Sequence, residues 1–148
     1  PGRASAMRAA LAALVFLLLP VAAMAQQDAS NPIIARMLAF TEAYNAQDAA
    51  AIATFYSPDA VLLPPGAPPV IGREAIAAHY AQAFAAGARD LQFRVFEVIA
   101  YEGRAVEMGE TSVIVGDQRI LGRYMHYWEA IGDEILLARD MYQVVRIE

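Results

Sequence analysis

The feature that most limits the possible folds is the second half of the chain, from Leu91 to Ile147. Its apolar residues recur with a period of two, which is typical of β-strands. Turn signals at Glu102-Gly103, Gly116-Asp117 and Gly132-Asp133 predict four strands, at about 91–101, 104–115, 119–130 and 134–147. The connections are too short for crossover helices, so we expect these strands to form an antiparallel meander.

The first half of the chain predicts three helices, at about 32–45, 48–56 and 73–86. Asn31 before Pro32 is typical of a helix N-terminus, and Asp48 is a natural cap for the second helix. A short strand is expected at 60–63, followed by a proline-rich loop at 64–69 that cannot join a ladder. Three helices followed by an antiparallel sheet indicate an α+β fold.

Both faces of the predicted sheet are apolar or aromatic. The two alternating sets include Met108, Met125, Tyr127 and Tyr142 on one side, and Val113, Ile120, Tyr124, His126 and Trp128 on the other. Three helices can cover only one face, so the second must meet a partner or leave a large apolar patch in water. We therefore expect a homodimer through the outer sheet face.

Composition excludes several classes of function. The 148 residues are 58% hydrophobic, with 16 acidic side chains against 11 basic ones, all of them Arg, which indicates one globular domain with a net charge of -5. No basic stripe for a nucleic acid is present. Cysteine is absent, which removes disulfides and thiolate metal sites. With only two His and no phosphate-binding loop, we expect no metal and no cofactor.

The N-terminal region is typical of a secretory signal peptide over residues 7–25. Met7-Arg8 precedes an apolar run at 11–19, and Ala23-Met-Ala25 matches an A-x-A cleavage site. The run is shorter than the roughly 20 residues of a membrane-spanning helix. Residues 1–6 are interpreted as an upstream extension or a cloning remnant, and 26–148 as the domain. A secreted or periplasmic location follows, with no stable membrane span after cleavage.

Several local strings occur in a fixed order along the chain: Ala43-Tyr-Asn-Ala-Gln-Asp48, Phe55-Tyr-Ser-Pro-Asp-Ala-Val61, Val70-Ile-Gly-Arg-Glu-Ala-Ile-Ala-Ala-His-Tyr80 and Ala138-Arg-Asp-Met141. With the order of elements, they resemble the SnoaL-like, ketosteroid-isomerase-like branch of the nuclear transport factor 2-like superfamily. The resemblance implies a cone-shaped fold, in which three N-terminal helices pack on a strongly curved antiparallel sheet. It also implies an apolar pocket open at one end.

The isomerase residues themselves are mostly missing from the matching positions. The general-base Asp would align with Pro64, the oxyanion Tyr with Phe40 and the oxyanion Asp with Met125, none of which can shuttle or donate a proton. Tyr56 and Tyr80 match tyrosines that resemble the supporting hydroxyl network of the isomerase. Steroid isomerisation by that mechanism is therefore not expected.

The resemblance also selects the sheet face that should line the pocket. If the hairpins pair Glu110 with Met125 and Met125 with Asp140, the two carboxylates lie roughly 10 Å apart, with Arg123 within reach of either. One carboxyl would then have its pKa raised by burial while Arg123 keeps the other ionised, which separates acid and base roles. Two other interpretations stay open: Arg123 neutralises a buried carboxylate, or the group binds a polar part of a ligand.

The remaining expected pocket residues are Phe40, Tyr44, Tyr56, Tyr80, Met108, Ser112, Met125, Tyr127 and Tyr142. His79 on the third helix is a candidate acid or base near the pocket mouth, although an ordinary surface or hydrogen-bonded role fits the same position. His126 has the opposite alternation from Arg123 and is assigned to the outer face.

Three functions remain open on this evidence. The first is an exported protein that binds a small apolar or amphipathic molecule without the ketosteroid isomerase catalytic set. The second is a metal-free proton-transfer enzyme, an isomerase, dehydratase or hydrolase, that uses Glu110, Arg123 and Asp140, with His79 as a further candidate. The third is a non-catalytic dimerisation module, which a cavity filled by side chains would favour.

Overall fold

The computed structural model describes residues 29–148, so the predicted signal peptide and residues 1–6 lie outside the described residues. The elements in chain order are α1 (Pro32–Asn45), α2 (Ala49–Thr54), β1 (Tyr56–Leu63), β2 (Val70–Ile71), α3 (Arg73–Ala85), β3 (Ala88–Tyr101), β4 (Arg104–Val115), β5 (Gln118–Ile131) and β6 (Glu134–Ile147). The three predicted helices and four long strands are confirmed to within a few residues. In the part of the chain so described, no helix is long and apolar enough to cross a membrane.

The first two helices begin at the residues that the sequence marks as caps. The Asn31 side chain accepts hydrogen bonds from the backbone N–H of Ile33 at 2.9 Å and of Ile34 at 3.4 Å. Asp48 accepts from the N–H of Ala51 at 2.9 Å. These bonds satisfy backbone donors that have no partner within the helix.

The six strands form one sheet in the order β2-β1-β6-β5-β4-β3. Strands β3 to β6 are the predicted antiparallel meander. The expectation of a wholly antiparallel sheet is wrong at one place, because β1 runs parallel to β6. A parallel pair needs a long connection, and here α3 and three strands of the meander lie between the two partners.

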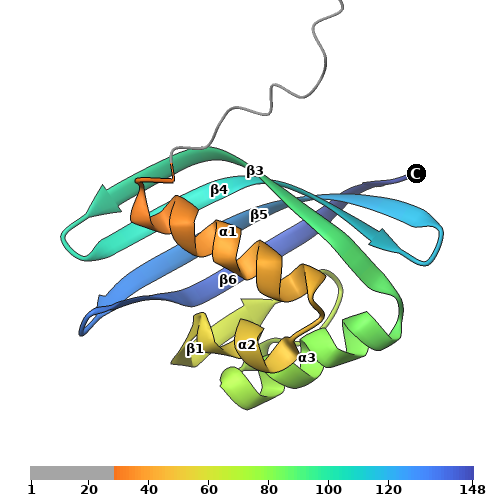
Figure 1. The fold of residues 1–148 in the computed structure, drawn as a ribbon, viewed down its shortest axis with the longest axis horizontal. Coiled ribbons are helices and arrows are strands. Elements are labelled where there is room, and N and C mark those ends of the chain that lie inside the picture. Colours follow the sequence, from red (N-terminus) through yellow and green to blue (C-terminus); the bar gives the residue numbers. More distant parts are fainter. Residues whose placement is uncertain (1–28) are drawn as a thin grey trace, which may run out of the picture.

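The helices lie on one side of the sheet. Figure 1 shows the long strands β3 to β6 curving over α1, with α2 and α3 beside β1. Phe40 of α1, Ile52 of α2 and Ile76 of α3 pack with Trp128 and Leu137 of the sheet in one apolar core. Among residues 29–148, no helix covers the opposite face of the long strands.

The register of the meander differs from the expected one, and this reverses part of the pocket face. Glu110 pairs with Arg123 rather than with Met125, and Met125 pairs with Met141. The ladder between β5 and β6 is irregular between Tyr127 and Trp128, where the extra residue Ala138 of β6 forms a bulge. A shift of one residue exchanges the two faces of a strand, so Asp140 lies opposite His126.

Candidate functional site

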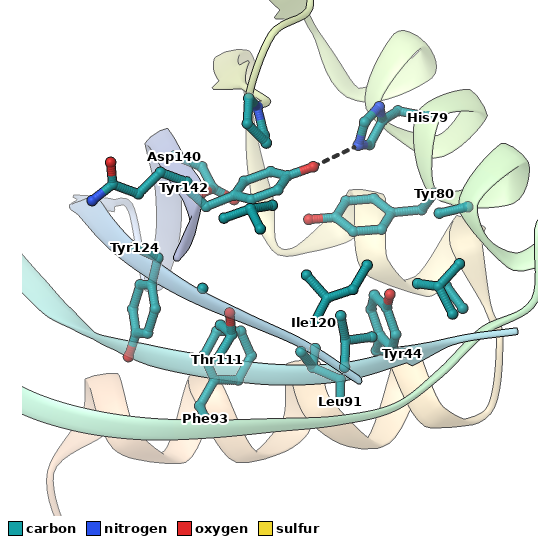
Figure 2. Close-up of a pocket in the computed structure, with 18 of the residues that line it drawn as sticks. Tyr44, His79, Tyr80, Leu91, Phe93, Thr111, Ile120, Tyr124, Asp140 and Tyr142 are labelled. Carbon is teal, nitrogen blue, oxygen red and sulfur yellow. Dashed lines mark hydrogen bonds between the residues drawn. The ribbon is translucent and has the colours of Figure 1, made fainter. Parts of the chain in front are cut away.

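A cavity of about 300 Å³ lies between the inner face of the sheet and helices α1 and α3. Figure 2 shows side chains from both layers gathered around it. Most of the lining is aromatic or aliphatic and includes Phe40, Tyr44, Leu91, Phe93, Val113 and Ile120. His79, His126 and Asp140 are its ionisable residues besides tyrosines, and within residues 29–148 no Arg lines it. A preformed apolar space with a few polar groups is typical of a small-molecule site.

Glu107 of β4 is fully buried at the base of the site. Its Oε1 accepts a short hydrogen bond from the Tyr124 hydroxyl, and its Oε2 accepts one from Trp128 Nε1 at 3.3 Å. The same Oε2 lies 2.8 Å from His126 Nδ1. Tyr124 and Trp128 act as donors here, and an ionised carboxylate only accepts, so this environment suits Glu107 as a carboxylate with His126 Nδ1 as the third donor.

Asp140 of β6 lies on the other side of His126 and is 4% exposed. Its Oδ2 accepts a 2.7 Å hydrogen bond from the Tyr56 hydroxyl, and the hydroxyls of Tyr56 and Tyr80 are 2.8 Å apart. Tyr56 has one proton and gives it to Asp140, so Tyr80 must be the donor to Tyr56. The hydroxyls of Tyr80 and Tyr56 thus hold the Asp140 carboxylate in place through its Oδ2.

The second oxygen of Asp140 is less well satisfied. Asp140 Oδ1 lies 3.3 Å from His126 Nε2, but among the residues described no partner meets hydrogen-bond geometry with this buried atom. Asp140 also lines the cavity. The site therefore offers a buried carboxylate oxygen with spare accepting capacity.

His126 is buried between these two carboxylates. Both of its ring nitrogens face a carboxylate oxygen, which favours a proton on each nitrogen. Burial alone would lower the pKa of His126, but the negative charges of Asp140 and Glu107, together with the hydrogen bond to Glu107, raise it to about 9. At neutral pH an imidazolium thus lies between two carboxylates, which leaves one net negative charge.

The tyrosine hydroxyls around the cavity remain protonated at neutral pH. Burial, and after it the Asp140 carboxylate, raises the pKa of Tyr56 and of Tyr80 well above the usual value. The same two causes raise the pKa of Tyr142 to about 12. These hydroxyls can therefore donate hydrogen bonds but carry no charge of their own.

His79 of α3 lies at the edge of the cavity beside β6. Its Nε2 is 3.4 Å from the Tyr142 hydroxyl, the pair joined by the dashed line in Figure 2. Burial lowers the pKa of His79, although the Asp140 charge opposes this effect. His79 is therefore mainly neutral at pH 7, in contrast to His126.

The structure divides the predicted site residues between the two faces of the sheet. Asp140 and His79 line the cavity, as do the predicted Phe40, Tyr44, Tyr80 and Tyr142. Tyr56 is buried and reaches the site through its bond to Asp140. The expected pocket positions of the other six residues are wrong, because the outer face holds Glu110, Arg123, Met108, Ser112, Met125 and Tyr127.

The predicted neighbours Glu110 and Arg123 do meet, but outside the pocket. Glu110 pairs with Arg94 at 2.6 Å and with Arg123 at 3.6 Å, and the side chains of both arginines are more than half exposed. The hydrogen bond from Arg94, followed by the charges of Arg94 and Arg123, lowers the pKa of Glu110. Exposed ion pairs of this kind contribute little to stability, and this one has no access to the cavity.

Two central residues of the site were not among those predicted. His126 was assigned to the outer face and is instead buried in the site, and Glu107 was not considered. A signal was available, since Glu107 lies between Ala105 and Gly109 in the alternation that β4 turns toward the core. An acidic residue in the inward alternation of a strand requires buried donors, which Tyr124, His126 and Trp128 supply.

Comparison with known proteins identifies a matching family and several solved structures of the same fold. The model of the SnoaL-like domain family matches residues 37–137. A search of curated proteins finds no match.

Among solved structures, a ketosteroid isomerase-like protein from Erwinia carotovora atroseptica is 20% identical and has a TM-score of 0.69, covering 81% of this chain and 98% of its own. A putative calcium/calmodulin-dependent protein kinase II association domain from Xanthomonas campestris is 18% identical, with a TM-score of 0.70 and coverages of 77% and 86%. An NTF2-like protein of unknown function from Shewanella oneidensis is 18% identical, with a TM-score of 0.68 and coverages of 76% and 97%. These likenesses show a shared fold.

Proposed function

Because the chain belongs to the SnoaL-like domain family of the NTF2-like superfamily, we propose that it binds a small, largely apolar molecule between α1, α3 and the sheet. The observation that carries this proposal is the open cavity of about 300 Å³ whose lining includes Asp140. Met108 and Met125, two of the residues expected to line the pocket, lie on the outer face and do not occupy this space. The cavity therefore remains available to a ligand.

The character of the lining supports an apolar ligand with one polar end. Phe40, Phe93 and Val113 supply apolar contacts, and polar groups converge at Asp140 and His79. Apolar contacts provide most of the affinity in such sites, while a few fixed polar groups set the orientation. The polar groups at Asp140 are also the main support for the second candidate function, proton transfer.

An uncharged fluorophore tests the binding proposal directly. N-phenyl-1-naphthylamine brightens in apolar surroundings, and we expect saturable binding with one molecule per chain. Val113→Trp fills the cavity and should weaken binding by about tenfold or more. Ile99→Trp is the matched control, because Ile99 is 55% exposed and lies on the outer face, opposite Val106. Equal binding by both variants would contradict the proposal.

A second candidate is proton transfer with Asp140 as the base. It is favoured by the incompletely satisfied Oδ1 of Asp140, a residue that lines the cavity, with Tyr56 and His126 placed to hold the carboxylate. Glu110 and Arg123 have no part in this version. The test is exchange of the α-hydrogens of 2-tetralone in deuterium oxide, which the protein should accelerate and Asp140→Asn should abolish. Exchange at the uncatalysed rate would remove this candidate.

The outer sheet face is the surface that supports a homodimer, and dimerisation is kept as a proposal. Exposed apolar side chains on this face are Phe96, Ile99, Tyr101, Met125 and Met141. His126, once assigned to this face, is not part of it. Export to the periplasm or the medium likewise remains a proposal that rests on the sequence of residues 7–25.

A further inference from the structure

Resting on the proposed binding function, we infer that the ligand carries a positively charged nitrogen, so that the cavity selects hydrophobic amines over neutral or carboxylate-bearing molecules of the same shape. The inference concerns the chemical class of the ligand. It is carried by the charge balance of the site, the incompletely satisfied oxygen of Asp140 and the aromatic rings that line the cavity.

The buried charges of the site do not balance. Glu107 and Asp140 supply two carboxylates, and His126 supplies one cation between them. Arg73 lies near Tyr56 but donates to its backbone carbonyl at 2.7 Å and is not part of the cavity lining. A buried charge without a partner is unfavourable. A ligand cation would restore neutrality.

Only one of the two carboxylate residues lines the cavity. Glu107 faces three donors and does not line the cavity. Asp140 lines the cavity, and its Oδ1 has only the poorly aligned His126 Nε2 at 3.3 Å. A protonated amine has hydrogen atoms to donate, and such a bond between opposite charges is stronger than one between neutral groups. The ammonium group should therefore sit at Asp140.

The surroundings of Asp140 favour a cation in a second way. Figure 2 shows the rings of Tyr44, Tyr80, Phe93, Tyr124 and Tyr142 gathered around the cavity. The faces of aromatic rings attract ammonium groups electrostatically. A carboxylate ligand, in contrast, would meet Asp140 without any Arg in the lining of the described cavity. The lining thus favours a ligand with a positive charge over one with a negative charge.

Three naphthalene compounds that share one apolar body test the inference. Binding of 1-naphthylmethylamine, 1-naphthylmethanol and 1-naphthoate is measured by calorimetry at pH 7. We expect the amine to bind about tenfold more tightly than the alcohol, with naphthoate the weakest. Asp140→Asn should bring the amine and the alcohol to similar affinity. Glu110→Gln, which removes a charge from the outer face, should bind the amine more tightly than the alcohol, as the unaltered protein does.

The outcomes separate this inference from the proposed function. If the alcohol or naphthoate binds as tightly as the amine, the inference is overturned and the binding function stands. If none of the three binds and the uncharged fluorophore also fails, both are overturned. The ranking on the unaltered protein decides the inference by itself if circular dichroism shows that Asp140→Asn does not fold.

Discussion

At the scale of single residues, Glu107, His126 and Asp140 form a buried row in which the imidazolium of His126 lies between two carboxylates. The two carboxylates supply acceptors to both nitrogens of His126, and the imidazolium offsets part of their charge. Tyr124 and Trp128 donate to the two oxygens of Glu107, and Tyr56 donates to Asp140 Oδ2. A buried ionic group of this kind is costly wherever a hydrogen bond is missing, and in this row the missing bond is at Asp140 Oδ1.

The chain has two histidines, and the pKa of one should lie above the ordinary histidine value and the pKa of the other below it. Nuclear magnetic resonance of the imidazole C–H signals is expected to show His126 with a pKa of about 9 and His79 with a lowered pKa. His79→Gln assigns the signals, because it removes only the one that titrates at low pH. Titration of both near 6.5 would contradict the buried row.

The same shift determines how stability responds to pH. The folded pKa of His126, about 9, exceeds the unfolded value near 6.5, so its stabilisation is fully present below about pH 6.5. It is lost as the pH rises through 9. The free energy of unfolding in urea should therefore fall between pH 6.5 and pH 9.5, a window in which the chain has no Lys or Cys side chain to titrate.

Removing the charge of Glu107 should destabilise the fold strongly. Glu107→Gln places an amide N–H₂ among the donors Tyr124, His126 and Trp128. Breaking a buried ion pair costs about 3–5 kcal/mol, measurable by urea unfolding. Glu110→Gln is the matched control on the exposed face and should leave stability nearly unchanged. Similar losses in both variants would contradict the burial of Glu107.

At the scale of elements, Gly109 lets β4 approach β3 at the irregularity in their ladder. An added Cβ would overlap the backbone carbonyl oxygen of Arg94 and come within 2.8 Å of the Tyr124 hydroxyl. Gly109→Ala should therefore destabilise the protein by about 1–3 kcal/mol, seen as a lower melting temperature. Ser112→Ala, on the outer face of the same strand, should have little effect. An unchanged melting temperature for Gly109→Ala would contradict this packing.

The sequence predicted where each strand begins and ends, but it did not predict which residues of each strand face the cavity. Gly103, Gly116 and Gly132 lie in the turns with positive φ, and the sequence marks each of them. The bulge at Ala138 shifts the register of β6 by one residue without any comparable signal. For that reason Asp140 was placed in the pocket correctly, while Glu110 and Arg123 were placed beside it wrongly. The parallel pairing of β1 depends on contacts between segments distant in sequence.

At the scale of the whole molecule, the sheet has two faces with different roles. The inner face holds the cavity under the helices, and the outer face exposes a groove lined by Phe96, Met108, Met125 and Met141. Exposed apolar area of this kind typically marks an interface. Val113 lines only the cavity and Met125 lines only the groove, so substitutions at these two residues alter one surface each.

Sedimentation equilibrium tests the role of the outer face. We expect a dimer at micromolar concentration and a monomer for Met125→Glu, because Met125 is 44% exposed in the centre of the groove. Gln82→Glu, which adds the same charge on exposed α3, should remain dimeric. A monomeric unaltered protein would remove the proposed interface without affecting the cavity.

The most direct test of the account is a crystal structure of the protein with 1-naphthylmethylamine bound. We expect the naphthalene rings among Phe40, Phe93 and Val113, with the ammonium nitrogen within hydrogen-bond distance of Asp140 Oδ1. A ligand seated in the outer groove beside Met125, with the inner cavity unoccupied, would contradict it.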